Sequence, residues 1–455
     1  MNAPTTLENT SLAAGFGAFL QPMAHARSAE WDPPVMIVSG EGVHVRDSSG
    51  RRLVDGVGGL WNMNLGYSCE PVKRAIREQL DLLPYYSSFE GTSHPAAPKL
   101  AQQIVELLAE EDVARVFFNS GGSDAVETAL KLARQYWKLV GAPTRTKFIS
   151  LKQGYHGVHF GGASVNGVSA FRAAYEPMLP GCFHIDTPWT YRNAFTEDPE
   201  ALARICAGLL EREIQFQTPD TVAAFIAEPV QGAGGVIVPP ASFWPLVREV
   251  CDRYGVLLIA DEVVTGFGRS GAMTGSRGWG VKPDIMCFAK GITSGYVPFG
   301  ATTLNARVAS AFANSPDPEG HVMHGYTYSA HPLGCVAAIA ALDEVVRQDL
   351  PGKAAKRGEY LMRRLKPFER RYDLVGEVRG KGLMVCLDLV SDKGARTPLA
   401  PDSRLNRDIA RHAASRGALV RAVGNNIILS PPLIIEEPEI DVIVDALDDA
   451  FKTFA

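Results

Sequence analysis

A short run of small and polar residues has the composition of a phosphate-binding loop. Residues 119–124, Asn-Ser-Gly-Gly-Ser-Asp, follow an apolar run and open an amphipathic segment. Small side chains let the free N–H groups at a helix start approach a phosphate, and the helix dipole favours its negative charge. The same residues also fit an ordinary helix cap, because Asp124 and Glu127 have capping-box spacing. Taken alone, the run leaves both interpretations open.

Three further reactive or aromatic residues stand where predicted buried strands stop. Lys290 follows an apolar run, and an amine that loses its water there can become nucleophilic enough to form a Schiff base. Asp261 ends another run, where a carboxylate needs a cation or hydrogen-bond donors. Tyr155 follows a third and offers an aromatic face. Each residue alone also fits a purely structural role, such as a surface ion pair or packing over a loop.

The combination of these residues is more specific than any one of them. The loops at the carboxyl ends of strands in an α/β sheet meet at one edge. Pyridoxal 5′-phosphate needs four contacts: a phosphate-binding loop, an aromatic side chain, a carboxylate and a lysine. The carboxylate keeps the pyridine nitrogen protonated, and the lysine binds the aldehyde. We therefore predict a pyridoxal-phosphate site with Lys290 and Asp261 at its centre.

Alternating apolar runs predict the elements that position these residues. Strands are expected at 115–118, 148–151, 222–226, 256–260, 285–288 and 300–304, with helices at 124–139, 202–216 and 243–254. Near-continuous apolar strands that alternate with helices indicate a mostly parallel sheet covered on both faces. The predicted fold class is α/β, with a doubly wound sheet in a large cofactor-binding domain at 66–336.

The segments on either side of this domain have a different pattern of predicted strands and helices. Residues 1–65 contain a meander of short strands at 35–38, 42–46 and 52–54. Residues 337–455 mix strands at 383–390, 418–421 and 427–429 with helices near 353–371, 403–416 and 437–453. We expect a smaller α+β domain at 337–455, with the N-terminal segment 1–65 packed against it.

Composition excludes several classes of protein. The 455 residues carry 45 lysines and arginines against 50 aspartates and glutamates, a formal net charge of −5, so we expect no nucleic-acid partner. The seven cysteines are widely spaced without a C-x-x-C pair, which indicates reduced thiols. The first 26 residues carry no lysine or arginine, unlike a signal peptide, and the longest aliphatic run, 336–342, is too short to span a membrane. A cytoplasmic protein without a membrane partner is expected.

Two other motifs point to different chemistry and do not fit their surroundings. Residues 266–271 match the G-x-G-x-x-G dinucleotide pattern, but the residues after them do not form a helical pattern, which that fingerprint requires. His321 and His324 have metal-like spacing in a loop without a third ligand. We therefore expect neither a nicotinamide cofactor nor a metal.

With these residues identified, the sequence resembles the class III (subgroup II) pyridoxal-phosphate-dependent aminotransferases of fold type I, and most of all the ω-amino acid:pyruvate transaminases. The resemblance covers almost the whole chain. Its specific blocks are Asp55-Gly56, Gly59-Leu60-Trp61-Asn62, Tyr155-His156-Gly157, residues 228–235 (EPVQGAGG), 258–263 (LIADEV) and 266–269 (GFGR), Ala289-Lys290-Gly291 and Tyr326-Thr327-Tyr328.

The resemblance implies a role for each matching residue. Lys290 is implied as the Schiff-base lysine and proton shuttle, and Asp261 as the partner of the pyridinium nitrogen. The other implied cofactor contacts are Tyr155 on the ring, Val263 behind it, Glu228 as a second carboxylate near it, Gly122 and Ser123 on the phosphate, and Thr327 reaching the phosphate from the partner subunit. Trp61, Phe89 and Tyr155 are implied to line the substrate pocket, with Arg421 as a mobile arginine that pairs with a substrate carboxylate. Gly121 stands where relatives often have serine.

The implied activity is the transfer of an amino group from an ω-amino acid or primary amine to pyruvate, giving alanine by a ping-pong mechanism. The implied assembly is a homodimer or a dimer of dimers. An aminomutase or decarboxylase of the same fold, a cofactor-binding regulator and a nicotinamide-dependent oxidoreductase remain as alternatives. The sequence leaves the donor open among β-alanine, taurine, a diamine, 4-aminobutyrate and an aryl-alkylamine, and it leaves the enantiopreference open.

Overall fold

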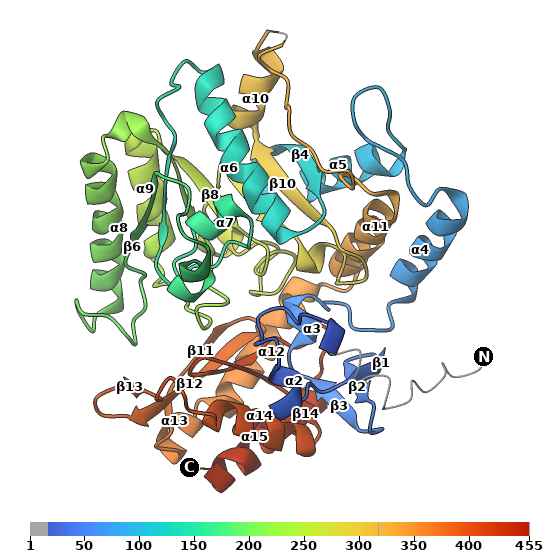
Figure 1. Ribbon diagram of the computed structural model, residues 1–455, viewed down its shortest axis with the longest axis vertical. Coiled ribbons are helices and arrows are strands. Elements are labelled where there is room, and N and C mark those ends of the chain that lie inside the picture. Colours follow the sequence, from blue (N-terminus) through green and yellow to red (C-terminus); the bar gives the residue numbers. More distant parts are fainter. Residues whose placement is uncertain (1–16, 317, 455) are drawn as a thin grey trace.

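A seven-stranded sheet forms the upper part of the protein in Figure 1, in a computed structural model that describes residues 17–316 and 318–454. Its strand order is β4-β10-β9-β8-β7-β5-β6. The strands are β4 (Val113–Asn119), β5 (Lys147–Leu151), β6 (Cys182–Ile185), β7 (Val222–Ala227), β8 (Leu257–Asp261), β9 (Ile285–Phe288) and β10 (Gly300–Asn305). Strands β5 to β9 pair in parallel, and β10 runs antiparallel to both of its neighbours. The predicted doubly wound, mostly parallel sheet is confirmed.

Helices cover both faces of this sheet because successive strand residues point to opposite sides. On one face, Ile226 and Ile259 pack with α6 (Gly122–Leu139) and α10 (Ala306–Asn314). On the other face, Phe225 and Leu258 pack with helices α8 and α9. The helices around the other face and its edge are α4 (Glu70–Leu82), α5 (Ala96–Leu107), α8 (Pro199–Phe216), α9 (Phe243–Tyr254) and α11 (Pro332–Arg347). The near-continuous apolar character of these strands follows from this double burial.

A second sheet lies in the lower part of Figure 1. It contains β11 (Val375–Lys381), β12 (Met384–Asp392), β13 (Thr397–Pro398), β15 (Arg421–Val423) and β16 (Asn426–Leu429). The helices of this part are α12 (Leu350–Leu365), α13 (Phe368–Arg371), α14 (Leu405–Ser415) and α15 (Glu437–Phe454). Strand β11 was not anticipated, because glycine and charged residues interrupt its apolar pattern, and Arg379 within it is buried against Glu377 and Asp388.

The N-terminal strands form a third, small sheet of β1 (Ile37–Glu41), β2 (His44–Asp47), β3 (Arg52–Asp55) and β14 (Ala418–Leu419). Strand β14 comes from the C-terminal part and pairs in parallel with β3. This pairing supports the predicted packing of the N-terminal segment with the C-terminal part. The domain boundaries after residues 65 and 336 stay predictions.

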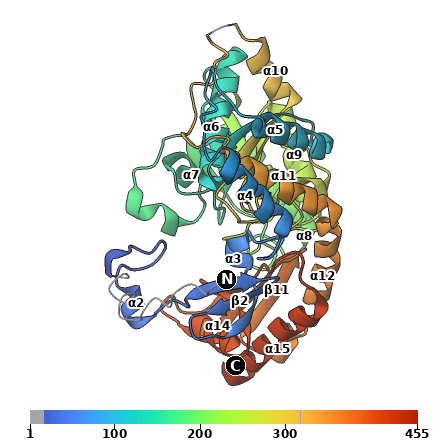
Figure 2. The same ribbon diagram turned by 90° about the vertical axis from the view of Figure 1, so that its right-hand side faces the viewer.

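Short elements connect these layers. They are α2 (Ser28–Trp31), α3 (Gly58–Trp61) and α7 (Phe160–Ser164), and the 3₁₀ turns η1 (Ala109–Glu111), η2 (Ser169–Phe171), η3 (Ala173–Tyr175), η4 (Pro219–Thr221), η5 (Ser276–Trp279) and η6 (Lys290–Ile292). In Figure 2, α2 and the loops around α7 project to the same side of the molecule. Within the described residues, no helix has the length and apolar content needed to cross a bilayer. All seven cysteines are free thiols, six of them buried.

Candidate active site

A cavity of about 510 Å³ lies where the carboxyl ends of several strands of the large sheet meet. Its volume is in the range of small-molecule and cofactor sites. Strands β4, β5, β7, β8 and β9 each contribute the residues that follow their last position. Of the predicted site residues, those that line the cavity are Trp61, Gly122, Ser123, Tyr155, Glu228, Asp261, Val263, Lys290 and Arg421.

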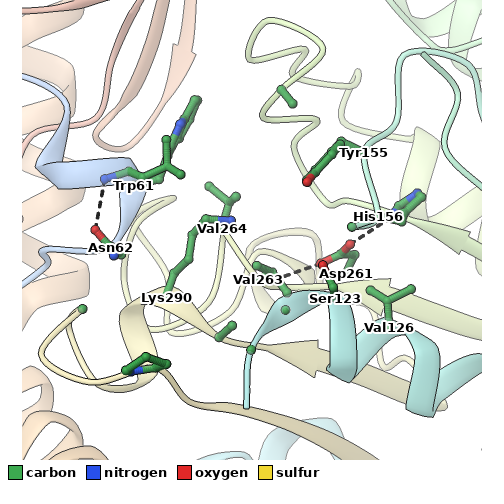
Figure 3. Close-up of a pocket in the computed structure, with 18 of the residues that line it drawn as sticks. Trp61, Asn62, Ser123, Val126, Tyr155, His156, Asp261, Val263, Val264 and Lys290 are labelled. Carbon is green, nitrogen blue, oxygen red and sulfur yellow. Dashed lines mark hydrogen bonds and ion pairs between the residues drawn. The ribbon is translucent and has the colours of Figure 1, made fainter. Parts of the chain in front are cut away.

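Lys290 extends into this cavity from the end of β9 (Figure 3). Its backbone has a φ of 44°, which is uncommon for a residue with a side chain and is found mainly where surrounding structure enforces it. Loss of water inside the cavity lowers the pKa of the Lys290 amine, while the nearby Asp261 and Glu228 carboxylates oppose that shift. A lysine with a lowered pKa has a larger neutral fraction, which is the form that attacks a carbonyl.

Asp261 is fixed on the opposite side of the cavity, at the end of β8. Its side chain is 4% exposed, and its Oδ2 lies 2.8 Å from Nδ1 of His156. Its Oδ1 accepts the N–H of Val263 at 3.1 Å. The backbone N–H of His156 in turn donates to the side-chain oxygen of Asn166. The carboxylate therefore has one orientation, which is visible beside His156 in Figure 3.

Glu228 supports the loops around Asp261. Its two carboxylate oxygens accept the backbone N–H groups of Tyr155 at 2.9 Å and Gly232 at 2.8 Å. Burial, together with the nearby Asp261 charge, raises the pKa of Glu228 to about 7. Glu228 therefore holds the segment that contains Tyr155. Its carboxyl group is partly protonated near neutral pH.

The predicted phosphate loop forms the start of helix α6. Residues 120–123 line the cavity, and Gly122 begins the helix. A Cβ at Gly122 would lie 3.0 Å from Val263, and one at Gly157 would lie 2.7 Å from Oγ of Ser123. Glycine at these positions lets three loops meet around the helix start. A Cβ at Gly121 would meet nothing within 4 Å, so packing does not require glycine there.

The substrate side of the cavity combines an apolar wall with one guanidinium. Trp61 is 6% exposed and lies across the cavity from Tyr155 in Figure 3. Arg421 is half-buried, and desolvation lowers the pKa of its guanidinium. Lys290 is the other lysine or arginine among the described residues that line the cavity.

Sequence reasoning missed several residues that line the cavity. His156 was part of a recognised motif, but nothing in the sequence placed it against Asp261. Phe171 contacts Tyr155 edge-on, with ring centroids 4.9 Å apart, from the short 3₁₀ turn η2, which is too short to give a periodic signal. Met23 reaches the cavity from the N-terminal segment.

Phe89 and Thr327 do not line the cavity of their own chain. Phe89 is 52% exposed, and Thr327 is also exposed. The two segments lie together, because Tyr85 donates from its hydroxyl to the Thr327 carbonyl at 2.7 Å and Gly325 lies against the Phe89 ring.

The arrangement fits pyridoxal phosphate. The start of the long helix α6 gives N–H donors for a phosphate, Tyr155 gives an aromatic face, and Asp261 and Lys290 stand at opposite sides of the space between. Fold and site together define a pyridoxal-phosphate-dependent enzyme that acts on amines.

The chain belongs to the class III aminotransferase family, whose model (Aminotransferase class-III) matches residues 26–451. A curated relative, the putrescine–pyruvate aminotransferase of Pseudomonas aeruginosa, is 37% identical over 90% of this chain and 88% of its own length. A solved amine transaminase from an uncultivated Pseudomonas species, with bound pyridoxal phosphate, is 54% identical with a TM-score of 0.94, covering 96% of this chain and 99% of that one. An (S)-enantioselective ω-transaminase from Thermomicrobium roseum is 39% identical with a TM-score of 0.95, covering 99% and 100%. The protein is therefore a pyridoxal-phosphate-dependent aminotransferase.

Proposed function

We propose that the protein is an ω-transaminase that moves an amino group from an ω-amino acid or primary amine to pyruvate, giving alanine in a ping-pong cycle. The observation that carries this proposal is that Arg421 and Trp61 line the same cavity as Lys290. One wall can therefore hold a carboxylate, and another can hold an apolar amine. The amino-mutase, decarboxylase, regulator and oxidoreductase alternatives have no specific support in this chain, which belongs to an aminotransferase family.

Lys290 is the group that moves protons in this proposal. When bound, pyridoxal phosphate supplies an aldehyde that condenses with amines and a protonated ring that withdraws electrons. The Lys290 Nζ takes the proton from the substrate carbon next to the amine nitrogen and delivers it within the same cavity. The Asp261 carboxylate has a fixed orientation and would hold the ring nitrogen of the bound cofactor, and Tyr155 would hold the face of the ring. A base on a short tether is effective because its target is held nearby.

Arg421 supports pyruvate as the acceptor. Among the described residues that line the cavity, it is the one guanidinium, and pyruvate has one carboxylate. The diaminobutyrate–2-oxoglutarate transaminase of Halomonas elongata, 37% identical over 90% of this chain and 89% of its own length, is named for a dicarboxylate acceptor. Reaction of the amine-loaded enzyme with pyruvate and, separately, with 2-oxoglutarate distinguishes the two acceptors. A faster reaction with 2-oxoglutarate would contradict the proposal.

Substitution of Arg421 by alanine is expected to affect acids selectively. We expect Arg421→Ala to slow the half-reactions of pyruvate and β-alanine about 10- to 100-fold, because a charged hydrogen-bonded partner is worth on the order of 2 kcal/mol. The half-reaction of a carboxylate-free amine should change little. Stopped-flow measurement of each half-reaction provides the comparison, with Arg416→Ala as a control because Arg416 pairs with Asp449 on the surface. Equal losses of half-reaction rate for acids and for carboxylate-free amines would show that Arg421 has a structural role only.

The proposed assembly is a homodimer in which each chain completes the other's site. Phe89 and Thr327 support this proposal, because they are exposed on adjoining segments and do not line their own cavity. The choice between a dimer and a dimer of dimers stays open, and the cytoplasmic location stays a prediction from the sequence.

Hybrid dimers test this sharing directly. A Thr327→Arg chain should block the phosphate site of its partner, and a Lys290→Ala chain lacks its own reactive amine. When the two inactive chains are refolded together, random pairing should restore about a quarter of the wild-type sites, since half of the dimers are hybrids with one intact site each. The measurement is transaminase activity of the mixture against each variant alone. No recovery on mixing would show that Thr327 acts within its own chain, and a fully active Thr327→Arg chain would show that Thr327 has no role at the phosphate.

A further inference from the structure

Asp55 is a buried carboxylate that the catalytic scheme does not use. It ends β3 and is 1% exposed. Its Oδ1 accepts the N–H groups of Val57 at 2.9 Å and Gly58 at 3.0 Å. Its Oδ2 accepts the N–H of Gly59 at 2.8 Å and the hydroxyl of Tyr67 at 2.6 Å. A buried carboxylate is costly unless its oxygens are satisfied, so these donors fix the turn that follows β3.

That turn has an unusual backbone conformation. Gly58 has a φ of 58°, Gly59 of 66° and Trp61 of 65°. Such conformations persist only where the surroundings enforce them, most of all at a residue as bulky as tryptophan. Ser430 also holds the turn. Its backbone N–H donates to the Gly56 carbonyl at 2.8 Å, and its hydroxyl donates to the Val57 carbonyl at 2.7 Å. Asp55 and Ser430 therefore hold the turn from two sides.

The same turn connects the two sides of the substrate pocket, Trp61 on one side and Arg421 on the other. Asp55 pairs with Leu419 in the parallel β3–β14 ladder, and Gly56 donates to the Leu419 carbonyl at 2.9 Å. Arg421 follows two residues after Leu419, and Trp61 follows the turn. The distance between the apolar wall and the guanidinium therefore depends on the β3–β14 pair and the turn that Asp55 and Ser430 hold, together with the β15–β16 pair that carries Arg421.

We propose that Asp55 is a positioning residue that sets the placement of Trp61 in the cavity and thereby the size of the amine that the enzyme accepts. This inference rests on the proposed function, because Trp61 limits substrate size only if amines bind against it. The competing explanation is that Asp55 stabilises the N-terminal sheet and has no selective effect on substrates.

The variant Asp55→Asn separates these explanations. An asparagine keeps the shape of the side chain, but its amide NH₂ would face the Gly59 N–H or the Val57 and Gly58 N–H groups, so donor would meet donor. Tyr67→Phe is a milder variant that removes one of the four donors. Asp47→Asn is the matched control, because Asp47 ends β2 of the same sheet, is 3% exposed, and its Oδ1 accepts from Ser49 and Arg51 in a turn that does not line the cavity.

The first measurement is donor selectivity. We compare kcat/KM for isopropylamine and for a naphthyl-substituted ethylamine, with pyruvate as acceptor. Asp55→Asn should lower the ratio of kcat/KM for isopropylamine to kcat/KM for the naphthyl-substituted amine about tenfold. Tyr67→Phe should lower this ratio by less, and Asp47→Asn should leave it unchanged. In a Trp61→Gly background, Asp55→Asn should have no further effect on this ratio, because the side chain through which it acts is gone. An undiminished effect in that background, or equal losses for both amines, would overturn the proposal.

The second measurement does not depend on activity. Amide hydrogen exchange of segment 53–67 should become faster in Asp55→Asn and stay at the wild-type rate in Asp47→Asn. If the wild type transfers no amino group from any donor, the proposed function fails, and the exchange rates alone decide whether Asp55 holds the turn. Unchanged exchange in Asp55→Asn would overturn the positioning role in either case.

Discussion

Replacement of Lys290 by alanine should reduce transamination by at least ~10⁴-fold. Loss of a positioned general base alone typically costs 10²–10⁴-fold, and this variant also loses the amine that binds the aldehyde. Lys290 stands at the end of a fully buried strand, with a lowered pKa and an enforced backbone conformation. The Lys290 side chain lines the cavity and is not part of the hydrophobic core, so the variant should fold and bind the cofactor non-covalently.

Two measurements check this result. Borohydride reduction of the wild type, followed by peptide mapping, should label Lys290, and the variant should give no label. Lys282→Ala is a suitable control, because Lys282 is an exposed lysine that lies just before the same strand. A small amine added to the solvent should restore part of the activity of Lys290→Ala, since it can enter the cavity as a replacement base. A label on another lysine would contradict the assignment.

The central part of the site could be predicted because strand ends are readable in the sequence. Lys290, Asp261 and Tyr155 each follow an apolar run, and all three runs are strands whose residues are buried on both faces. The parallel arrangement of β5, β8 and β9 then brings their ends to one edge. Three residues far apart in the chain could therefore be assigned to one cavity.

Other parts of the site depend on contacts that leave no periodic signal. Met23 reaches the cavity from a turn near the N-terminus, and Phe171 reaches it from the short 3₁₀ turn η2. His156 faces Asp261 because of how its loop folds. The predicted strand 418–421 is in fact two strands, since β14 pairs with β3 and β15 pairs with β16. A change of sheet within four residues follows from tertiary pairing, which local propensity does not encode. Arg421 lines the cavity, and its role toward a substrate carboxylate stays a prediction.

Glu262 has a different role from its neighbour Asp261. It is buried directly after Asp261, but its oxygens accept from Thr265 and Ser276 and from the Gly275 N–H. Successive residues at a strand end point in opposite directions, so one carboxylate faces the cavity and the other anchors the following loop. Substitutions at the two positions should therefore have different consequences.

Asp261→Asn is expected to lower kcat on the order of 10³-fold while the fold is retained. An asparagine can keep the hydrogen bond from the Val263 N–H through its oxygen. Its amide NH₂ can donate to Nδ1 of His156 once the imidazole proton moves to Nε2, so the structural contacts survive. What would disappear is the carboxylate that would keep the ring nitrogen of the bound cofactor protonated. The measurements are the pre-steady-state rate of each half-reaction and the visible absorbance of the bound cofactor, at matched folded fractions.

Glu262→Gln provides the opposite pattern. Its amide NH₂ would face a donor that the carboxylate now satisfies, so the folded state should lose about 1–3 kcal/mol of stability. The protein that remains folded should keep its rate, because Glu262 does not line the cavity. Thermal unfolding measured alongside the half-reactions separates the two effects. If both variants lose stability and Asp261→Asn keeps the wild-type rate, Asp261 has no catalytic role. Its role would then be to hold the His156 loop.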